Sequence, residues 1–221
     1  VKGVLKKANG LVGTLIISAY ATAMLVMFGR LINSIFILSD GLKIGLTIIA
    51  VLTLTLAEAA AFSKKNLREI LLFSSIAQSG LVVVLFLNGL ILPAVLVLAN
   101  NVISKVVLFT VSAKMAENTG SDNIYDLKGI FASYRCFGIG FTVAAMSMVG
   151  LPFFFGFVAK ANALIGLLQG GNIWLPIVIL LVSVVEGVYF MRILTNLWNP
   201  GEEGELAKLK DVNDFKMKKF V

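Results

Sequence analysis

Residues 150–156 read Gly-Leu-Pro-Phe-Phe-Phe-Gly and lie in the middle of an apolar stretch that extends from 130 to 167. One transmembrane helix takes about 20 residues, so this stretch is too long for one straight span. Pro152 lacks a backbone donor and the flanking glycines permit non-helical angles, so the sequence predicts a helix broken between Gly150 and Gly156. Irregular backbone at membrane depth is tolerated where protein buries it or water meets it, which indicates a polar path. The competing interpretations are an ordinary proline kink, or two short segments that do not both span.

Five further apolar stretches are long enough to cross a membrane, and turn residues connect them. Together with the broken stretch, the predicted spans lie near 11–38, 44–62, 67–88, 91–113, 130–167 and 173–198. The sequence therefore predicts an all-α polytopic membrane protein with about six transmembrane helices. Its expected parts are a helical bundle over 1–199 and a charged cytoplasmic tail over 200–221.

The composition excludes several classes of function. Of the 221 residues, 58% are hydrophobic and 14% charged, which leaves no polar shell for a soluble enzyme. The chain has no histidine, which excludes an ordinary zinc site, and its single cysteine, Cys136, cannot hold an iron–sulfur cluster alone. A Gly-rich nucleotide loop is also missing. We therefore expect no cofactor, no metal site and no catalysis within this chain.

The net charge of +7 is distributed along the chain in a way that indicates membrane topology. Six spans place both termini and two of the loops on one side, and nearly all loop lysines and arginines fall there. They are Lys2, Lys6, Lys7, Lys64, Lys65, Arg68, Lys114, Lys128, Lys208, Lys210, Lys216, Lys218 and Lys219, against Lys43 on the other side. The positive-inside rule predicts a cell-membrane protein with both termini cytoplasmic, and the pattern does not indicate nucleic-acid binding.

Five ionisable residues lie within the predicted spans, namely Arg30, Glu58, Lys105, Lys160 and Glu186. Each costs about 2.5–3.5 kcal/mol at a helix centre on insertion scales, so each needs a partner, water or a function. Lys105 and Glu186 are the deepest. Arg30 is near the end of its span, where its side chain can reach the interface.

Polar residues surround Lys105 in the sequence. Asn101 precedes it by one helical turn, Asn100 and Ser104 flank this position, and Gln78 provides a polar position on the preceding span. We predict an ion path through Lys105, Lys160, Glu186 and Glu58, because a desolvated lysine exchanges protons. The alternatives are that the glutamates only neutralise the lysines in buried pairs and that the amides only join helices.

The two acids and the two deep lysines lead to a structural expectation. Because an uncompensated buried charge costs several kcal/mol, one glutamate should lie within reach of Lys105 or Lys160. Glu186 is the favoured partner because it is nearest the centre of its span. If both glutamates lay more than about 10 Å from either lysine, a relay within this chain would be wrong.

Four motifs in order resemble the antiporter-like subunits of respiratory complex I, of multisubunit cation/proton antiporters and of membrane-bound hydrogenases. They are Asn66-Leu67-Arg68 followed by Phe73-Ser74-Ser75-Ile76-Ala77-Gln78-Ser79-Gly80; Asn101-Val102-Ile103-Ser104-Lys105-Val106-Val107-Leu108-Phe109; Asn123 to Gly129; and Gly150-Leu151-Pro152 with Gly156-Phe157-Val158-Ala159-Lys160. The resemblance implies that Lys105 is the relay lysine of a central channel and Lys160 the lysine of the second broken helix. Gln78 and Asn101 stand where many members have histidine, so waters would bridge there.

The resemblance covers only part of the family's fold, because the six spans are similar to the eighth to thirteenth of a full member. It implies a split gene product, a fragment or a degenerate half-subunit. The expected function is H⁺ or Na⁺ translocation within a larger redox-driven or antiporter complex, with an oxidoreductase complex as its setting. Expected partners are lipid and other membrane subunits, one of which supplies the missing half. The alternatives are a structural lateral subunit that moves no ion and, less favoured, an independent small-solute carrier.

Overall fold

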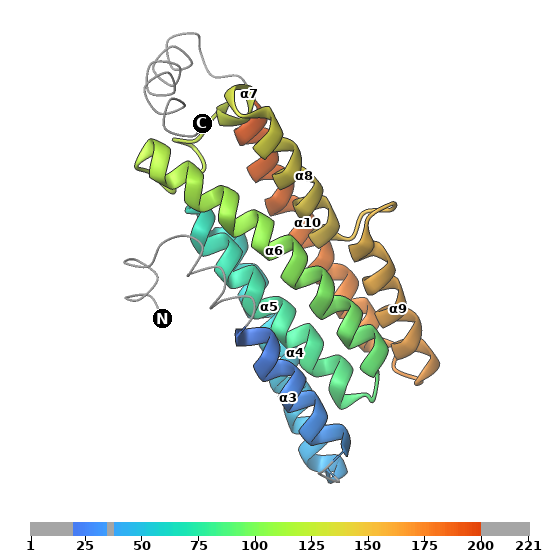
Figure 1. Cartoon of the computed structure of the whole chain (residues 1–221). Coiled ribbons are helices and arrows are strands. Elements are labelled where there is room, and N and C mark those ends of the chain that lie inside the picture. The colour runs from blue at the N-terminus through green and yellow to red at the C-terminus, as the bar shows by residue number, and fades with distance from the viewer. Residues whose placement is uncertain (1–19, 35–37, 200–221) are drawn as a thin grey trace.

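The computed structural model describes residues 20–34 and 38–199. In this part of the chain the structure is helical and has no strand, and the long helices run roughly along one direction in an elongated bundle (Figure 1). The helices are α3 (Ala21–Ser34), α4 (Asp40–Ser63), α5 (Leu67–Leu87), α6 (Ile91–Thr119), α7 (Ile130–Ser133), α8 (Arg135–Val149), α9 (Phe155–Gln169) and α10 (Trp174–Trp198). This arrangement confirms the predicted all-α fold.

Four of the described helices, α4, α5, α6 and α10, are long and apolar enough to cross a membrane. The stretch 130–167 is broken as predicted, because α8 ends at Val149 and α9 begins at Phe155. Each of these two helices has 15 residues. At 1.5 Å per residue each is about 22 Å long, shorter than the roughly 30 Å of a hydrocarbon core. Neither half is therefore long enough to cross the hydrocarbon core alone as a straight helix.

The fourth predicted span ends too early at residue 113, because α6 continues to Thr119. Lys114 and Asn118, predicted to lie in a connection, are therefore on the helix. The helix ends only at Gly120, which adopts the left-handed conformation (φ 75°) and donates its backbone N–H to Ala116. Much of the predicted first span, 11–38, and the whole tail, 200–221, lie outside the described residues.

The two connections that the charge pattern assigned to one side do meet at one end of the bundle. Asn66, between α4 and α5, forms an isolated β-bridge with Asn123, between α6 and α7. The Leu67 N–H donates to Asp122 O (2.8 Å) and the Ile124 N–H donates to Lys65 O (3.0 Å). We call this the lysine-rich end. At the opposite end, the Asn172 amide donates to Asn88 Oδ1 (3.1 Å) and joins the turn between α9 and α10 to the turn between α5 and α6.

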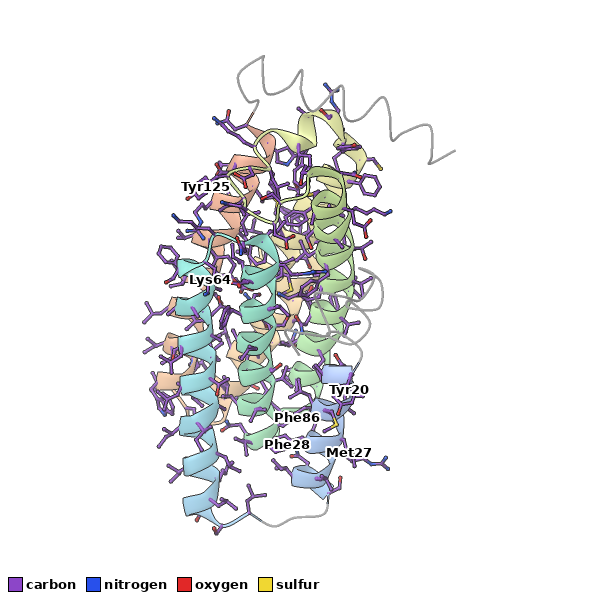
Figure 2. The ribbon with its side chains drawn as sticks, turned by 90° about the vertical axis from the view of Figure 1, so that its left-hand side faces the viewer. Tyr20, Met27, Phe28, Lys64, Phe86 and Tyr125 are labelled. Carbon is purple, nitrogen blue, oxygen red and sulfur yellow. The ribbon has the colours of Figure 1, made fainter. Side chains whose placement is uncertain are left out.

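Helix α3 packs against α5 near that opposite end (Figure 2). A Cβ atom at Gly29 would lie 2.6 Å from the Phe86 ring, so glycine is required for this close approach. Asn33 also donates to Phe86 O (3.2 Å). The contact fixes α3 on the side of the bundle away from α8 and α9 (Figure 1).

Two hydrophobic clusters fill the interior, one above the other. The cluster near the lysine-rich end includes Ala61, Leu71, Leu108 and Phe131, and the cluster near the opposite end includes Ala57, Leu81, Val97 and Ala163. Glu58, Ser74, Gln78, Lys105, Lys160 and Glu186 are buried at the boundary between the two clusters. Large apolar side chains such as Leu56, Leu181 and Ile139 are exposed on the outside. The bundle is thus apolar outside and has a charged layer within its core.

Candidate functional site

The broken helix provides the first half of the buried charged layer. Gly150 ends α8 in the left-handed conformation (φ 83°), and the chain re-enters helix at Phe155. A helix end leaves carbonyl groups without intrahelical partners. The Lys160 ammonium, on α9, reaches back and donates to the carbonyl oxygen of Val149 (2.9 Å). The break therefore provides a buried acceptor for a lysine on the helix that follows it.

The same ammonium forms a short ion pair with Glu186 on α10. The distance from Lys160 Nζ to Glu186 Oε2 is 2.6 Å. The other carboxylate oxygen, Oε1, accepts a hydrogen bond from the Gln78 amide of α5 (3.1 Å). Glu186 is 1% exposed and Lys160 9%. The expected contact between Glu186 and a deep lysine is thus confirmed, and Gln78 orients the acid.

A polar contact between the two half-helices and α6 holds the break in place. Gly156 lies so close to α8 that a Cβ atom there would be 1.6 Å from the Ser147 carbonyl oxygen. The Gly156 N–H, one of the unpaired donors at the start of α9, donates to Ser147 Oγ (3.2 Å). Ser147 Oγ in turn donates to Asn100 Oδ1 (2.6 Å), and Asn100 Nδ2 donates to Ser147 O (3.3 Å). Asn100 is on α6, the helix that carries Lys105.

Lys105 is held differently from Lys160. Its ammonium donates to Ser74 Oγ (2.7 Å) and to the Leu71 carbonyl oxygen (3.1 Å), both on α5. The residue is 1% exposed, and no carboxylate of the described chain forms an ion pair with it. Its direct partners are therefore neutral oxygen atoms.

Glu58 is the second buried acid, and its carboxylate interacts with the charges of both lysines. It is 2% exposed and interacts with Glu186, Lys105 and Lys160. Neither of its carboxylate oxygens has a hydrogen-bond partner in the described part of the chain. The hydroxyl of Tyr189, which interacts with this carboxylate, is also buried and without a hydrogen bond in the described part of the chain. The layer thus contains two acids and two lysines.

The structure places the other predicted residues as follows. Ser104 is buried beside Lys105, whereas Asn101 is half-buried and its Oδ1 atom has no partner among the described residues. Pro152 is exposed in the break. Arg30, which we expected to reach the interface, is exposed on α3. The layer therefore brings together the two lysines, the two glutamates and Gln78, and Asn101 lies at its margin.

Asn100 was expected only as a polar neighbour of Lys105, and the roles of Ser147 and Tyr189 were not predicted. Asn100 and Ser147 are polar residues within apolar helices, and this signal could have identified them. Tyr189 gave no such signal, because an aromatic residue in an apolar stretch is ordinarily a packing residue. In the part of the chain that the structure describes, no three His, Cys, Asp or Glu side chains are grouped to hold a metal ion.

Comparison with known proteins identifies the family. Residues 6–186 match the family described as NADH:quinone oxidoreductase/Mrp antiporter, TM. The chain is 30% identical over 200 residues to NADH-quinone oxidoreductase subunit N of Azoarcus sp. (strain BH72), which covers 85% of this chain and 41% of that protein.

Two solved structures share the fold. A chain of the Mrp complex from Dietzia sp. DQ12-45-1b has a TM-score of 0.81 at 22% identity, covering 90% of this chain and 38% of that chain. A chain of the membrane-bound sulfane sulfur reductase, an archaeal respiratory membrane complex, has a TM-score of 0.76 at 23% identity, covering 96% and 46%. The chain spans less than half the length of these relatives. It belongs to the NADH:quinone oxidoreductase/Mrp antiporter family of membrane subunits.

Proposed function

We propose that this chain is an ion-translocating half-module that moves H⁺ or Na⁺ within a larger redox-driven or antiporter complex of the cell membrane. The observation that carries the proposal is the buried charged layer. Lys105, Glu58, Glu186 and Lys160 come from four different helices and meet between two apolar clusters. Such charges in a membrane interior are costly and ordinarily mark ion pathways.

The two lysines have unequal roles in this proposal. Lys105 can lose a proton without leaving an unpaired anion, because its hydrogen-bond partners, Ser74 Oγ and the Leu71 carbonyl oxygen, are neutral. Loss of a proton from Lys160 would leave Glu186 as an unpaired buried anion. We therefore assign the exchangeable proton to Lys105 and a positioning charge to Lys160. Gln78, Ser104 and Asn101 provide polar groups along the path.

The partners follow from the part of the family's fold that the chain covers. We propose that neighbouring membrane subunits, including one with the other antiporter half, pack against the apolar outer faces. We propose that the lysine-rich end of the described bundle faces the cytoplasm and that both termini are cytoplasmic, as the positive-inside rule predicts. The tail over 200–221 belongs to that side, and the bundle extends over 1–199.

A structural lateral subunit is the alternative function, and one observation favours it. The Lys160–Glu186 pair is complete within the chain, and a satisfied pair can serve packing alone. In that case the charged layer would only join helices, and the chain would brace a neighbouring antiporter module. The alternative predicts that Lys105 contributes nothing to ion movement.

The test compares Lys105→Met with the matched control Lys43→Met, which removes an exposed lysine at the start of α4. The tagged chain is purified with the subunits that accompany it and reconstituted in liposomes loaded with a pH-sensitive dye. Under an imposed potassium diffusion potential, we expect Lys105→Met to lower proton entry at least about tenfold, as for loss of a proton-transfer group. Radioactive sodium uptake is measured in parallel.

Lys43→Met should match the wild-type flux, because its side chain is outside the charged layer. Subunit composition and melting temperature of each preparation establish that assembly is intact. If assembled Lys105→Met carries protons and sodium at the wild-type rate, the structural alternative replaces the proposal.

A further inference from the structure

The charged layer has two levels, separated by one helical turn. Lys105 and Ser74 form one level, and Gln78, Glu186 and Lys160 form the other. Ser74 and Gln78 are four residues apart on α5, so their side chains are on the same face about one turn apart. No hydrogen bond in the described structure joins the two levels directly. A proton that leaves Lys105 therefore needs a further group to reach the second level.

Tyr189 lies at the first level, beside Ser74, on the face of α10 that carries Glu186. It follows Glu186 by three residues on α10, so its side chain lies on the same face one turn further along. It is 0% exposed, and its hydroxyl is close enough to interact with both the Ser74 hydroxyl and the Glu58 carboxylate. Its ring packs against Phe190, with centroids 4.9 Å apart. The packed ring fixes the oxygen, while the hydroxyl hydrogen remains able to turn.

Three buried polar atoms here lack hydrogen bonds in the described chain. They are the Tyr189 hydroxyl oxygen and both carboxylate oxygens of Glu58. Buried polar groups are nearly always hydrogen-bonded, so a group of unpartnered ones calls for an explanation. The Tyr189 hydroxyl is a donor and the Glu58 carboxylate oxygens are acceptors, so a hydrogen bond between them can form. The neighbouring Arg192 donates from Nη2 to Lys64 O (2.8 Å) and lies over Phe62, and its buried Nε has no hydrogen-bond partner among the described residues.

We propose that Tyr189 is the proton-passing link between Lys105 and Glu58. A hydroxyl both donates and accepts, so Ser74 and Tyr189 can pass a proton in sequence. Lys105 gives a proton to Ser74 Oγ as Ser74 gives its own to Tyr189, and Tyr189 gives its own to a Glu58 oxygen. Both hydroxyls end as they began, Lys105 becomes neutral, and Glu58 becomes a carboxylic acid. The proposal rests on the proposed function.

The transfer also couples the first level to the second. Glu58 and Glu186 are both acids and repel each other when both are charged. A proton on Glu58 removes this repulsion and leaves Glu186 paired with Lys160 alone. Protonation of Glu58 therefore changes the electrostatic environment of Lys160, while the Lys160–Glu186 ion pair remains formed.

The test uses Tyr189→Phe, which removes one oxygen and keeps the packed ring. Tyr125→Phe is the matched control, because Tyr125 is exposed at the lysine-rich end (Figure 2). In the reconstituted complex, Tyr189→Phe should lower proton entry at least about tenfold. Its melting temperature and subunit composition should equal those of Tyr125→Phe, which separates the loss of the link from a loss of packing.

The second variant, Glu58→Gln, breaks the same link from the other side. If Tyr189 and Glu58 act in series, Glu58→Gln, Tyr189→Phe and the double variant should lose proton flux by the same factor. Fully multiplicative losses in the double variant would overturn the link. If Tyr189→Phe does not assemble, Glu58→Gln decides alone, and wild-type proton flux in it overturns the link.

Lys105→Met separates this inference from the proposed function. If Lys105→Met is slow and Tyr189→Phe is as fast as Tyr125→Phe, the tyrosine link is wrong and translocation through the chain stands. If both variants carry protons at the wild-type rate, the proposed function fails as well.

Discussion

Lys105 and Lys160 are buried in the same layer, but different groups hold them. Lys160 donates to a carboxylate at 2.6 Å and to a carbonyl at 2.9 Å. Lys105 donates to a hydroxyl at 2.7 Å and to a carbonyl at 3.1 Å. Lys105, the lysine without an ion pair, is therefore the candidate for proton exchange. The comparison teaches that depth alone does not define the role of a buried lysine, because its direct partners determine what a change of charge costs.

The largest effect should come from breaking the ion pair. Glu186→Gln keeps the shape of the side chain and leaves the Lys160 ammonium without its carboxylate. Removal of one partner of a buried pair costs about 3–5 kcal/mol, which corresponds to a melting temperature lower by roughly 10 °C in a chain of this size. The measurement is thermal unfolding of the purified complex in detergent. Glu117→Gln, which alters an exposed pair on α6, is the control.

A double variant sharpens the same prediction. Lys160→Met combined with Glu186→Gln removes both charges, and it should recover most of the lost stability because no lone charge remains. A Glu186→Gln variant that melts with the wild type would mean that the pair does not hold α9 against α10.

The broken helix could be predicted from the sequence because its signal is local. Pro152 and the flanking Gly150 and Gly156 determine the backbone by their own chemistry, whatever surrounds them. The structure adds why Gly156 is needed, since a side chain there would meet the Ser147 carbonyl. Long apolar stretches located the helices for a similar reason, because span length follows from membrane thickness.

The contacts of the layer could not be predicted in the same way. A membrane helix is apolar on all sides, so its sequence has no amphipathic stripe to show which face turns inward. Gln78 was placed near Lys105 on the preceding span, but its amide bonds Glu186, 108 residues later in the chain. Asn100 rather than its neighbour Asn101 packs against the broken helix. Such choices depend on how each helix is rotated, which only the packed bundle determines.

A smaller loss of stability is expected when one of the contacts of Lys105 is removed, because its hydrogen-bond partners are neutral. Ser74→Ala removes one acceptor of the Lys105 ammonium, while the Leu71 carbonyl remains. The expected cost is about 1 kcal/mol, because hydrogen bonds between membrane helices contribute little on average. Ser79→Ala is the control, since the Ser79 hydroxyl donates only to Ser75 O within its own helix. Thermal unfolding measures both, and a loss as large as that of Glu186→Gln would contradict the difference between the two lysines.

The smallest effect should come from an ion pair outside the layer. Lys64 and Glu69 lie 3.3 Å apart at the lysine-rich end, with side chains 39% and 31% exposed. Glu69→Gln should cost about 0.5 kcal/mol, because water and salt weaken exposed pairs. The decisive measurement is unfolding at low salt and at 1 M salt, where the screening length falls to about 3 Å. The loss caused by Glu69→Gln should disappear at high salt, whereas the loss caused by Glu186→Gln should persist because buried pairs are screened much less. If both losses respond to salt alike, then salt reaches Lys160 as freely as Lys64, and the charged layer is open to bulk solvent.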